Sequence, residues 1–348
     1  MKKLSMNEAY EGWIAGKGNL KDITFYKYTY MYEKFIAPYF GERKLDSLKR
    51  KDFSDYYAFL AEKRRLKPGT IRNYHNIIRQ ILQYAVDEEY LKKNPSDGAW
   101  VAVDKKNWLK ISKRHALSSE EQTSLLQFLN EDERYHRWFP SVQTLLGTGM
   151  RVGEFTGLRW CDVDLESGII DINHNLGRVF RKEPGSSQNG GREEYHYHLY
   201  VDSPKTLDSR RRIPLLSSVR NALEMEREMQ AEEGVHCRVE IDGYTDFIFL
   251  NSAGGVQTAD ALNKMFDRIR KSHNEQKRGI ILPRFSCHTM RHTFATRLYE
   301  SGLSMKTIQA LMGHSDIKIT MNIYAEATES YKKEEMEKLE KMFNNLDK

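Results

Sequence analysis

The sequence predicts a mainly α-helical protein with a small antiparallel β-sheet, arranged in two domains. Its 348 residues are more than one typical domain needs and enough for two hydrophobic cores. Residues 1–97 show helical periodicity without strand-like alternation, whereas residues 117–330 mix helical stretches with short strand candidates. We therefore expect a helical N-terminal domain (1–97), a linker (98–116) and a larger α+β domain (117–330).

The N-terminal domain is expected to hold helices around residues 7–14, 23–39 and 51–64, followed by a long amphipathic helix. The apolar positions of the long helix follow the i, i+3, i+4, i+7 spacing: Tyr74, Ile77, Ile78, Ile81, Leu82 and Ala85. Thr70 is its expected N-cap, and Asn94-Pro95 ends the region.

The second domain is expected to begin at a capping box, in which Ser118 is the N-cap and Glu121 follows three residues later. Strands are expected at 168–173, 179–182, 195–201 and 211–215, around a glycine-rich turn. Further helices are expected at 219–232, 259–272, 287–301, 305–312 and 317–327. Residues 331–348 read as an amphipathic C-terminal helix with Met336, Leu339, Phe343 and Leu346 on one stripe.

Composition narrows the class of protein. No apolar run reaches the ~18 residues of a membrane span, and the N-terminal lysines precede no apolar signal segment. Three widely spaced cysteines (Cys161, Cys237 and Cys287) fit reduced thiols in a cytosolic compartment. Residues 1–97 carry 19 Lys and Arg against 13 Asp and Glu, whereas residues 98–348 carry 36 of each. The formal excess of positive charge therefore lies wholly in the N-terminal domain, which favours a DNA-gripping role for it.

A basic cluster surrounds the loop that enters the long helix of this domain. It consists of Lys63, Arg64, Arg65, Lys67, Arg72 and Arg79. Cations and free backbone N–H groups converge at such a helix start, so these six residues are candidate DNA-binding residues. An ordinary solvated helix face explains any single one of them equally well.

The candidate catalytic residues lie in five short segments of the second domain. They are Arg151, Lys205, His288, Arg291, His314 and Tyr324. Two arginines, a lysine and two histidines can surround one phosphate, and the tyrosine can attack it. This set fits phosphoryl transfer through a covalent enzyme intermediate, without a metal or another cofactor.

Each member of the set also has a plain structural explanation. Arg151 can pair with Glu154 on the same helix, where Glu154 can also orient nearby cations as a supporting residue. Tyr324 can pack in a core, and Lys205 can be solvated while Arg210, Arg211 and Arg212 compete for its role. A zinc site at His288 and His292 lacks the glutamate of HExxH and an evident acidic third ligand.

Taken in order, the segments resemble the tyrosine recombinases of the phage integrase family. The strings TGMRVGEFTGLRW, SPKTLDSRRRIPL, HTMRHTFATRL and LMGHSDIKITMNIYAE match that family in residue type and spacing, and nearly the whole chain is covered. The resemblance implies a helical core-binding domain followed by an α+β catalytic domain. VEIDGYTDFIFLN and the long glycine-rich hairpin look most like integrases of conjugative transposons.

The resemblance also implies a role for each catalytic residue. Tyr324 would attack the scissile phosphate to give a 3′-phosphotyrosine, and Arg151 and Arg291 would clamp the non-bridging oxygens. Lys205 would protonate the leaving 5′-oxygen, with His288 as proton acceptor and His314 hydrogen-bonded to the phosphate. Strand exchange would then need neither ATP nor metal, and it would insert and excise a mobile element.

Partners follow from the same resemblance. The chain would bind double-stranded DNA and assemble on it as a homotetramer by exchange of the 331–348 helix. It would also bind an excisionase-type accessory protein, and no membrane would be involved. The setting implied is the bacterial cytoplasm, at the nucleoid. Many such integrases carry an extra arm-binding domain, which this chain has almost no room for before its first helix. Either the element lacks arm sites or the chain is a truncated form.

Other functions stay open at this point. One is a recombinase that resolves chromosome or plasmid dimers, and another is a type IB topoisomerase-like enzyme that only relaxes DNA. A DNA-binding accessory protein would need a broken catalytic set, which is intact here. A metal-dependent transposase would need clustered acidic ligands, which are not apparent in the sequence.

Overall fold

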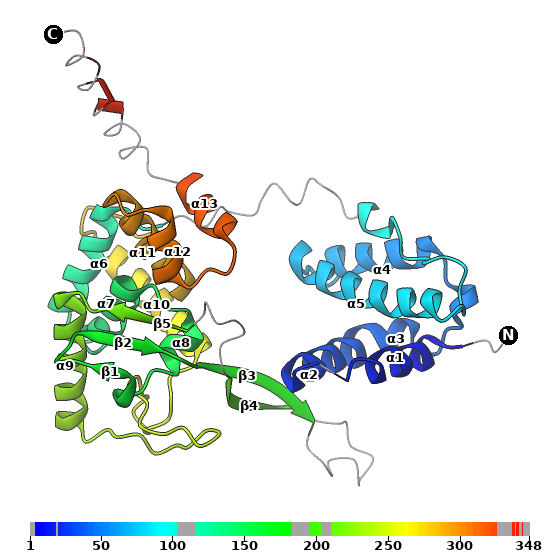
Figure 1. The fold of residues 1–348 in the computed structure, drawn as a ribbon, viewed down its shortest axis with the longest axis horizontal. Coiled ribbons are helices and arrows are strands. Elements are labelled where there is room, and N and C mark those ends of the chain that lie inside the picture. Colours follow the sequence, from blue (N-terminus) through cyan, green and yellow to red (C-terminus); the bar gives the residue numbers. More distant parts are fainter. Residues whose placement is uncertain are drawn as a thin grey trace. The chain divides into compact units, whose positions relative to one another are not determined.

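The computed structural model describes residues 4–18, 20–102, 116–182, 195–202 and 210–325, with short pieces at 336–337, 339–340 and 343. The chain divides into two compact units (Figure 1). The N-terminal unit comprises Met1–Lys113 and Arg178–His198, and the C-terminal unit comprises Arg114–Gly177 and Leu199–Lys348. The segment Arg178–His198 thus belongs to the N-terminal unit, although the residues on both sides of it in the chain belong to the C-terminal unit.

The N-terminal unit is a bundle of helices. Its elements are α1 (Met6–Ala15), α2 (Asp22–Met31), the π-helical turn Tyr32–Ile36, α3 (Ala37–Phe40), the 3₁₀ turn Leu45–Ser47, α4 (Arg50–Glu62), α5 (Pro68–Asp87) and the 3₁₀ turn Ala99–Ala102. One helix expected over 23–39 is therefore broken by a π turn. Thr70 as N-cap of the long helix is wrong: Lys67 caps it, and Pro68 occupies the first turn, where a missing N–H costs nothing.

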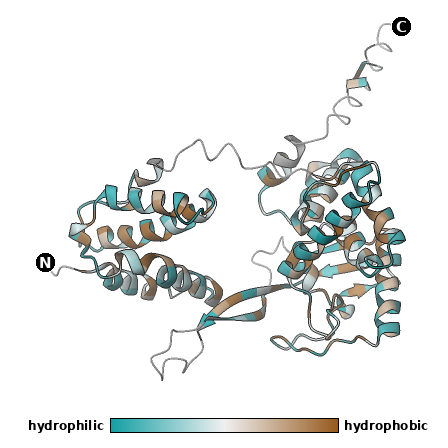
Figure 2. Cartoon of the chain, turned by 180° about the vertical axis from the view of Figure 1, so that it is seen from behind, coloured by the Kyte–Doolittle hydropathy of each residue, from teal (hydrophilic) through white to brown (hydrophobic). Residues whose placement is uncertain are grey.

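The core of this unit is built by the inward faces of amphipathic helices. Figure 2 shows that each long helix carries both hydrophobic and hydrophilic residues. The apolar stripe expected on α5 is buried, with Ile78, Ile81 and Leu82 fully inaccessible. Ala99, at the start of the expected linker, is also fully buried in this core, whereas 103–115 lie outside the described residues.

The hairpin consists of β3 (Asn175–Lys182) and β4 (Tyr195–Asp202). Its far half belongs to the N-terminal unit because it packs against α2. The Phe180 ring stacks on Tyr30 with 5.0 Å between centroids, and the Arg181 guanidinium lies 4.9 Å from the centroid of the Tyr26 ring. Aromatic stacking and cation–π contact therefore fix this half of the hairpin to α2.

The C-terminal unit combines helices with a small sheet. Its helices are α6 (Ser119–Glu131), α7 (Phe139–Thr148), α8 (Val152–Thr156), α9 (Ser217–Glu233), α10 (Ala259–Glu275), α11 (Cys287–Glu300), α12 (Met305–Met312) and α13 (Ile317–Ala325), with 3₁₀ turns at His136–Trp138 and Trp160–Asp162. The expected capping box at Ser118 and Glu121 is confirmed by two reciprocal hydrogen bonds. The bounds expected for α12 are confirmed without change.

The sheet of this unit is antiparallel and has three strands. β2 (Ile169–Ile172) lies between β1 (Val163–Asp164), which the sequence did not predict, and β5 (Arg211–Pro214). In the register of β2 with β5, Ile170 faces Ile213 and Ile172 faces Arg211. This register, together with the alternation of β5, sends the Arg211 side chain toward the interior and leaves Arg212 exposed.

Helix α7 lies at the centre of the C-terminal core, where it packs against α9 and α11. Val142 and Leu145 of α7, Val219 and Leu223 of α9 and Met290 of α11 are all fully buried in one apolar cluster. The cluster gives α11 a rigid base, so the side chains on its other face are held in place. No helix among the described residues is long and apolar enough to cross a membrane.

Helix α13 packs on α11 and α12, but much of its apolar surface faces solvent. Ile317 and Met321 are 41% and 55% exposed. Asp316 supports the start of this helix, because its carboxylate accepts from the backbone N–H of Lys318. Thr320, in contrast, is buried beside His314.

Candidate active site

Arg151 stands at the N-terminus of the short helix α8. Its backbone N–H and its Nη1 both donate to the carboxylate of Glu154, at 2.8 Å each. Its Nη2 donates to the carbonyl oxygen of Gly313, 162 residues away in the chain, at 2.6 Å. The side chain stays 39% exposed, so the guanidinium is held in place and remains accessible to a ligand.

Arg291 projects from the middle of α11 and is buried, with 5% of its surface exposed. Its Nη1 donates to the carbonyl oxygen of Gly149 (2.7 Å) and its Nη2 to that of Met312 (2.6 Å). Gly149 has φ +59°, and a Cβ there would come within 2.3 Å of the Phe294 ring. A glycine is therefore required for the chain to turn this closely over α11.

His314 follows the C-terminal glycine of α12. It is buried, and its Nδ1 lies 3.0 Å from the hydroxyl of Thr320 on α13. If the hydroxyl donates to Nδ1, the imidazole proton sits on Nε2. Burial is the largest cause that lowers the pKa of His314 to about 3, followed by the charges of Arg291, Arg151 and Arg211. The imidazole is therefore neutral at physiological pH.

Arg211 is the residue that sequence reasoning passed over in favour of Lys205. Its side chain is 5% exposed and forms two hydrogen bonds with Glu154, of 3.1 and 2.8 Å, and one with the carbonyl oxygen of Leu311, of 2.7 Å. One signal could have found it. In RRIPL the alternation puts Arg211 on the same strand face as Ile213, and a charge on a buried face needs a partner.

The electrostatics of this cluster favour an anion. Three guanidinium groups and one carboxylate leave two positive charges in a largely buried space. Burial would raise the pKa of Glu154, but hydrogen bonding and charge from Arg211 and the charge of Arg151 outweigh it and lower that pKa. Burial, then the charges of Arg151 and Arg211, lower the pKa of Arg291 to about 9, which still leaves it protonated at neutral pH. Bound anionic oxygens would relieve this repulsion.

The structure thus brings Arg151, Glu154, Arg291 and His314 together around the end of α12. His288 lies in the first turn of α11 and is exposed. The backbone of Tyr324 lies in α13, which packs on α11 and α12, while its side chain is outside the described residues. Lys205 is outside the described residues altogether. Among the residues that are described, no group of three His, Cys, Asp or Glu side chains could hold a metal ion.

The candidate DNA-binding residues lie around the α4–α5 turn of the N-terminal unit. All six, namely Lys63, Arg64, Arg65, Lys67, Arg72 and Arg79, are exposed. Arg79 forms an ion pair with Asp97 (3.2 Å), and the Arg64 guanidinium lies 5.7 Å from the centroid of the Phe59 ring. The cluster therefore presents a basic surface at the start of α5, in which Arg79 is partly neutralised.

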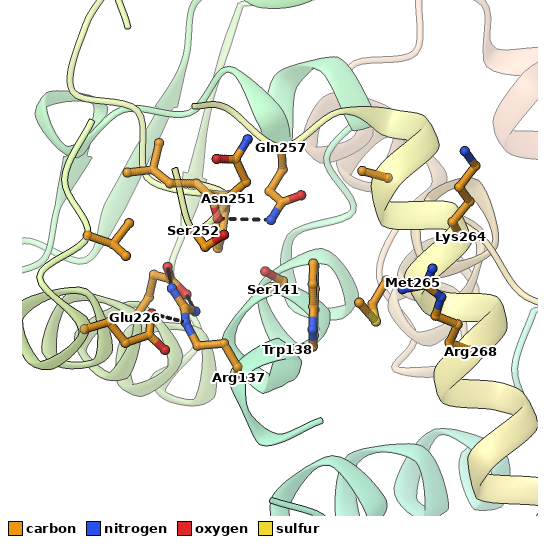
Figure 3. Close-up of a pocket in the computed structure, with 15 residues that line it drawn as sticks. Arg137, Trp138, Ser141, Glu226, Asn251, Ser252, Gln257, Lys264, Met265 and Arg268 are labelled. Carbon is orange, nitrogen blue, oxygen red and sulfur yellow. Dashed lines mark hydrogen bonds and ion pairs between the residues drawn. The ribbon is translucent and has the colours of Figure 1, made fainter. Parts of the chain in front are cut away.

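A separate cavity of about 650 Å³ lies between α7, α9 and α10 and shares no residue with the arginine cluster (Figure 3). Arg137 on its wall binds Glu226 through two hydrogen bonds of 2.6 and 2.9 Å and pairs with Glu233 at 3.0 Å. Trp138 and Met265 supply apolar lining, whereas Arg268 is exposed at the rim. The buried charges of this cavity are thus satisfied by each other.

Comparisons with known proteins agree with the geometry. Residues 115–330 match the model of the phage integrase family, and residues 6–102 match that of the phage integrase SAM-like domain. The transposase of transposon Tn916 from Enterococcus faecalis is 29% identical over 98% of this chain and 78% of its own length. A XerC-like tyrosine recombinase from Caldanaerobacter subterraneus is 30% identical over 93% of this chain and 79% of its own length.

The fold agrees with solved structures of the Tn1549 transposon integrase. One, in complex with transposon right-end DNA, superposes with a TM-score of 0.76 at 29% identity and covers 97% of this chain and 99% of that one. A second, in complex with circular intermediate DNA, gives the same TM-score, identity and coverage. The similarity therefore extends over both units and not over the arginine cluster alone.

Proposed function

The chain belongs to the phage integrase family and is a tyrosine-type site-specific DNA recombinase, and we propose that it inserts and excises a mobile element through a 3′-phosphotyrosine intermediate. One observation carries the proposal. Arg151, Arg291 and His314 converge at the end of α12, and the next helix, α13, bears Tyr324. The relatives named after transposons support DNA of a mobile element as the substrate.

In the first step the phenolic oxygen of Tyr324 attacks the phosphorus of the scissile phosphodiester. The P–O bond to the tyrosine forms as the bond to the 5′-oxygen breaks, and the phenolic proton passes to His288. A free tyrosine has a pKa near ~10, so cations close to the oxygen are needed for reaction at neutral pH. Lys205 gives its proton to the departing 5′-oxygen, since a lysine can release a proton and the neighbouring arginines cannot.

The transition state explains the arginine cluster. A phosphodiester carries one negative charge, and the pentacoordinate transition state carries a second on its non-bridging oxygens. Arg291 meets that charge from a buried position where water competes little, Arg151 meets it from a partly exposed position, and the neutral His314 donates from Nε2. Glu154 supports Arg151 from the same helix.

The second step is the reverse of the first with a different strand. The 5′-hydroxyl of a partner duplex attacks the phosphotyrosine, and the P–O bond to Tyr324 breaks as the new phosphodiester forms. Bond energy is conserved in the phosphotyrosine, so the exchange consumes no ATP. The chemistry proposed for this chain uses no metal or organic cofactor.

Assembly belongs to the same proposal. The basic surface at the α4–α5 turn grips double-stranded DNA through its phosphates. Four protomers act together as a homotetramer, in which the 331–348 helix of each docks on a neighbour, and an excisionase-type protein sets the direction. We place the reaction on nucleoid DNA in the bacterial cytoplasm.

A nicked suicide substrate tests the nucleophile. The nick lets the short strand beyond the cleaved phosphate diffuse away, so the covalent intermediate accumulates. We expect a 3′-linked protein–DNA adduct with the wild type and none with Tyr324→Phe, measured by denaturing electrophoresis. An adduct that persists in the phenylalanine variant would refute Tyr324 as the nucleophile.

Further experiments distinguish the proposed function from the alternative functions. Adduct formation in EDTA is expected, whereas its loss would favour a metal-dependent transposase. Two duplex sites in one reaction should yield recombinant strands. If only supercoil relaxation were seen, the enzyme would be a type IB topoisomerase-like protein, and recombination restricted to sites on dimeric chromosomes or plasmids would favour a dimer resolvase.

A further inference from the structure

Arg211 is a buried charge that the proposed chemistry does not use. It has no role in the phosphotyrosine step proposed above, yet it is more deeply buried than Arg151, with 5% of its side chain exposed against 39%. A buried guanidinium is costly unless its donors are satisfied, and here three described hydrogen bonds satisfy it. Its position therefore calls for an explanation in terms of its neighbours.

The end of α12 supplies that explanation. The last carbonyls of a helix lack intrahelical donors. The backbone N–H groups of Gly313 and His314 return to Ala310 and Gln309, as in a Schellman turn. The next three carbonyls in sequence each accept from a different arginine: Leu311 from Arg211, Met312 from Arg291 and Gly313 from Arg151. The negative end of the helix dipole thus aligns three guanidinium groups side by side.

Glu154 links two of these arginines. It accepts from Arg211 through both oxygens, and its Oε1 also accepts from Arg151. Without Arg211, Arg151 would be the one ion-pair partner left to the buried carboxylate among the described residues. Both carboxylate oxygens of Glu154 would then bind the Arg151 guanidinium. The Arg151 donors would then turn away from an incoming phosphate. Gly313 makes room for this arrangement, because a Cβ there would lie 2.9 Å from Arg211 Nη1.

We propose that Arg211 is a positioning residue that holds Glu154 and the end of α12, and thereby fixes Arg151 and Arg291 in the geometry that receives the scissile phosphate. The inference rests on the proposed function. It assigns Arg211 no contact with DNA and no proton transfer. Its planar fork is essential, because one group must bridge a carboxylate and a backbone carbonyl.

The test is single-turnover cleavage of the suicide substrate at saturating protein, with DNA affinity and thermal unfolding measured on the same full-length variants. We expect Arg211→Met to cleave ~10²-fold more slowly, since a small misplacement of a positioning group costs about that much. DNA affinity should be unchanged, because one phosphate among many contributes little to it. Arg211→Lys keeps the charge but cannot bridge both acceptors, so it should also slow cleavage.

Two further variants sharpen the result. Arg212→Met, on the exposed face of the same strand, should cleave at the wild-type rate. Combining Arg211→Met with Glu154→Gln removes the carboxylate that captures Arg151, so the double variant should cleave faster than Arg211→Met alone. The imidazole resonances of His314 provide a spectroscopic check, because loss of a neighbouring cation should raise its pKa in Arg211→Met and not in Arg212→Met.

The outcomes are separable. Wild-type cleavage by Arg211→Lys and Arg211→Met would overturn the inference, as would a slowing that disappears when rates are compared at equal folded fraction. If Arg211→Met does not fold, Arg211→Lys decides the matter alone. Failure of the wild type to form any adduct would instead refute the proposed function, whatever Arg211 does.

Discussion

At the scale of single residues, His314 shows how burial and the arginine cluster together control the protonation of a side chain. Its folded pKa of about 3 lies below the ordinary value of 6.5 because of burial and three neighbouring cations. Between these values the unfolded chain binds a proton that the folded chain does not, so stability falls as the pH falls. From about pH 7.5 to about pH 5, we expect the wild type to lose about 2 kcal/mol more unfolding free energy than His314→Gln.

Urea titrations at the two pH values measure this difference. His236→Gln, a substitution outside the arginine cluster, is the matched control. If His314→Gln and the wild type lost stability equally, His314 would accept a proton as readily in the folded chain as in the unfolded one. A neutral His314 as phosphate donor would then be untenable below about pH 6.5.

At the scale of elements, the junction of α7 and α9 depends on a buried ion pair. Arg137, just before α7, binds Glu226 of α9, whose side chain is 1% exposed. Removing one partner strands the other charge in the interior, so Arg137→Met should cost about 3–5 kcal/mol of unfolding free energy. Adding Glu226→Leu removes the stranded carboxylate and should recover most of that loss. Chemical denaturation measures both.

An exposed pair provides the comparison. Arg134 binds Asp132 at 2.8 Å, but its side chain is 68% exposed, so Arg134→Met should cost under ~1 kcal/mol. Equal losses for Arg137→Met and Arg134→Met would show that the α7–α9 pair behaves as a surface contact. The wall of the cavity in Figure 3 would then owe its shape to apolar packing alone.

The elements also show what the sequence could predict. Local signals such as the Gly313 cap and the Ser118 capping box located α12 and the start of α6, because a helix end is decided by a few adjacent residues. The choice among Arg210, Arg211 and Arg212 could not be made locally. It depends on the register of β5 against β2 and on a carbonyl that is 100 residues away in the chain. The joining of Arg151 to Gly313 is equally non-local.

At the scale of the whole molecule, the uneven distribution of charge matches the two units. The net positive charge of the sequence lies in residues 1–97, and the exposed basic surface at the α4–α5 turn lies there as well. In the C-terminal unit, three arginines (Arg151, Arg211 and Arg291) are instead held by Glu154 or by carbonyl oxygens at the end of α12. This division fits the proposed function, in which one unit would supply long-range attraction for DNA and the other would concentrate charge at one phosphate.

The helix proposed over residues 331–348 provides a test of the proposed homotetramer. Met336, Leu339 and Phe343 are 64%, 40% and 57% exposed in the single chain, which fits a stripe that a neighbour covers. Changing all three to glutamate, or ending the chain after Tyr331, should leave DNA binding and suicide-substrate cleavage intact. Recombination between two duplexes should fall, because strand exchange needs several protomers whereas one adduct needs a single active site.

The control is Glu337→Ala, on a different side of the same helix, which should recombine normally. Gel shifts on one and on two duplex sites separate binding from assembly, and strand-transfer yield reports the outcome. Undiminished recombination by the truncated chain would show that the helix does not hold the protomers together. A parallel loss of adduct would instead place the helix in support of its own active site, because α13, which bears Tyr324, precedes it in the chain.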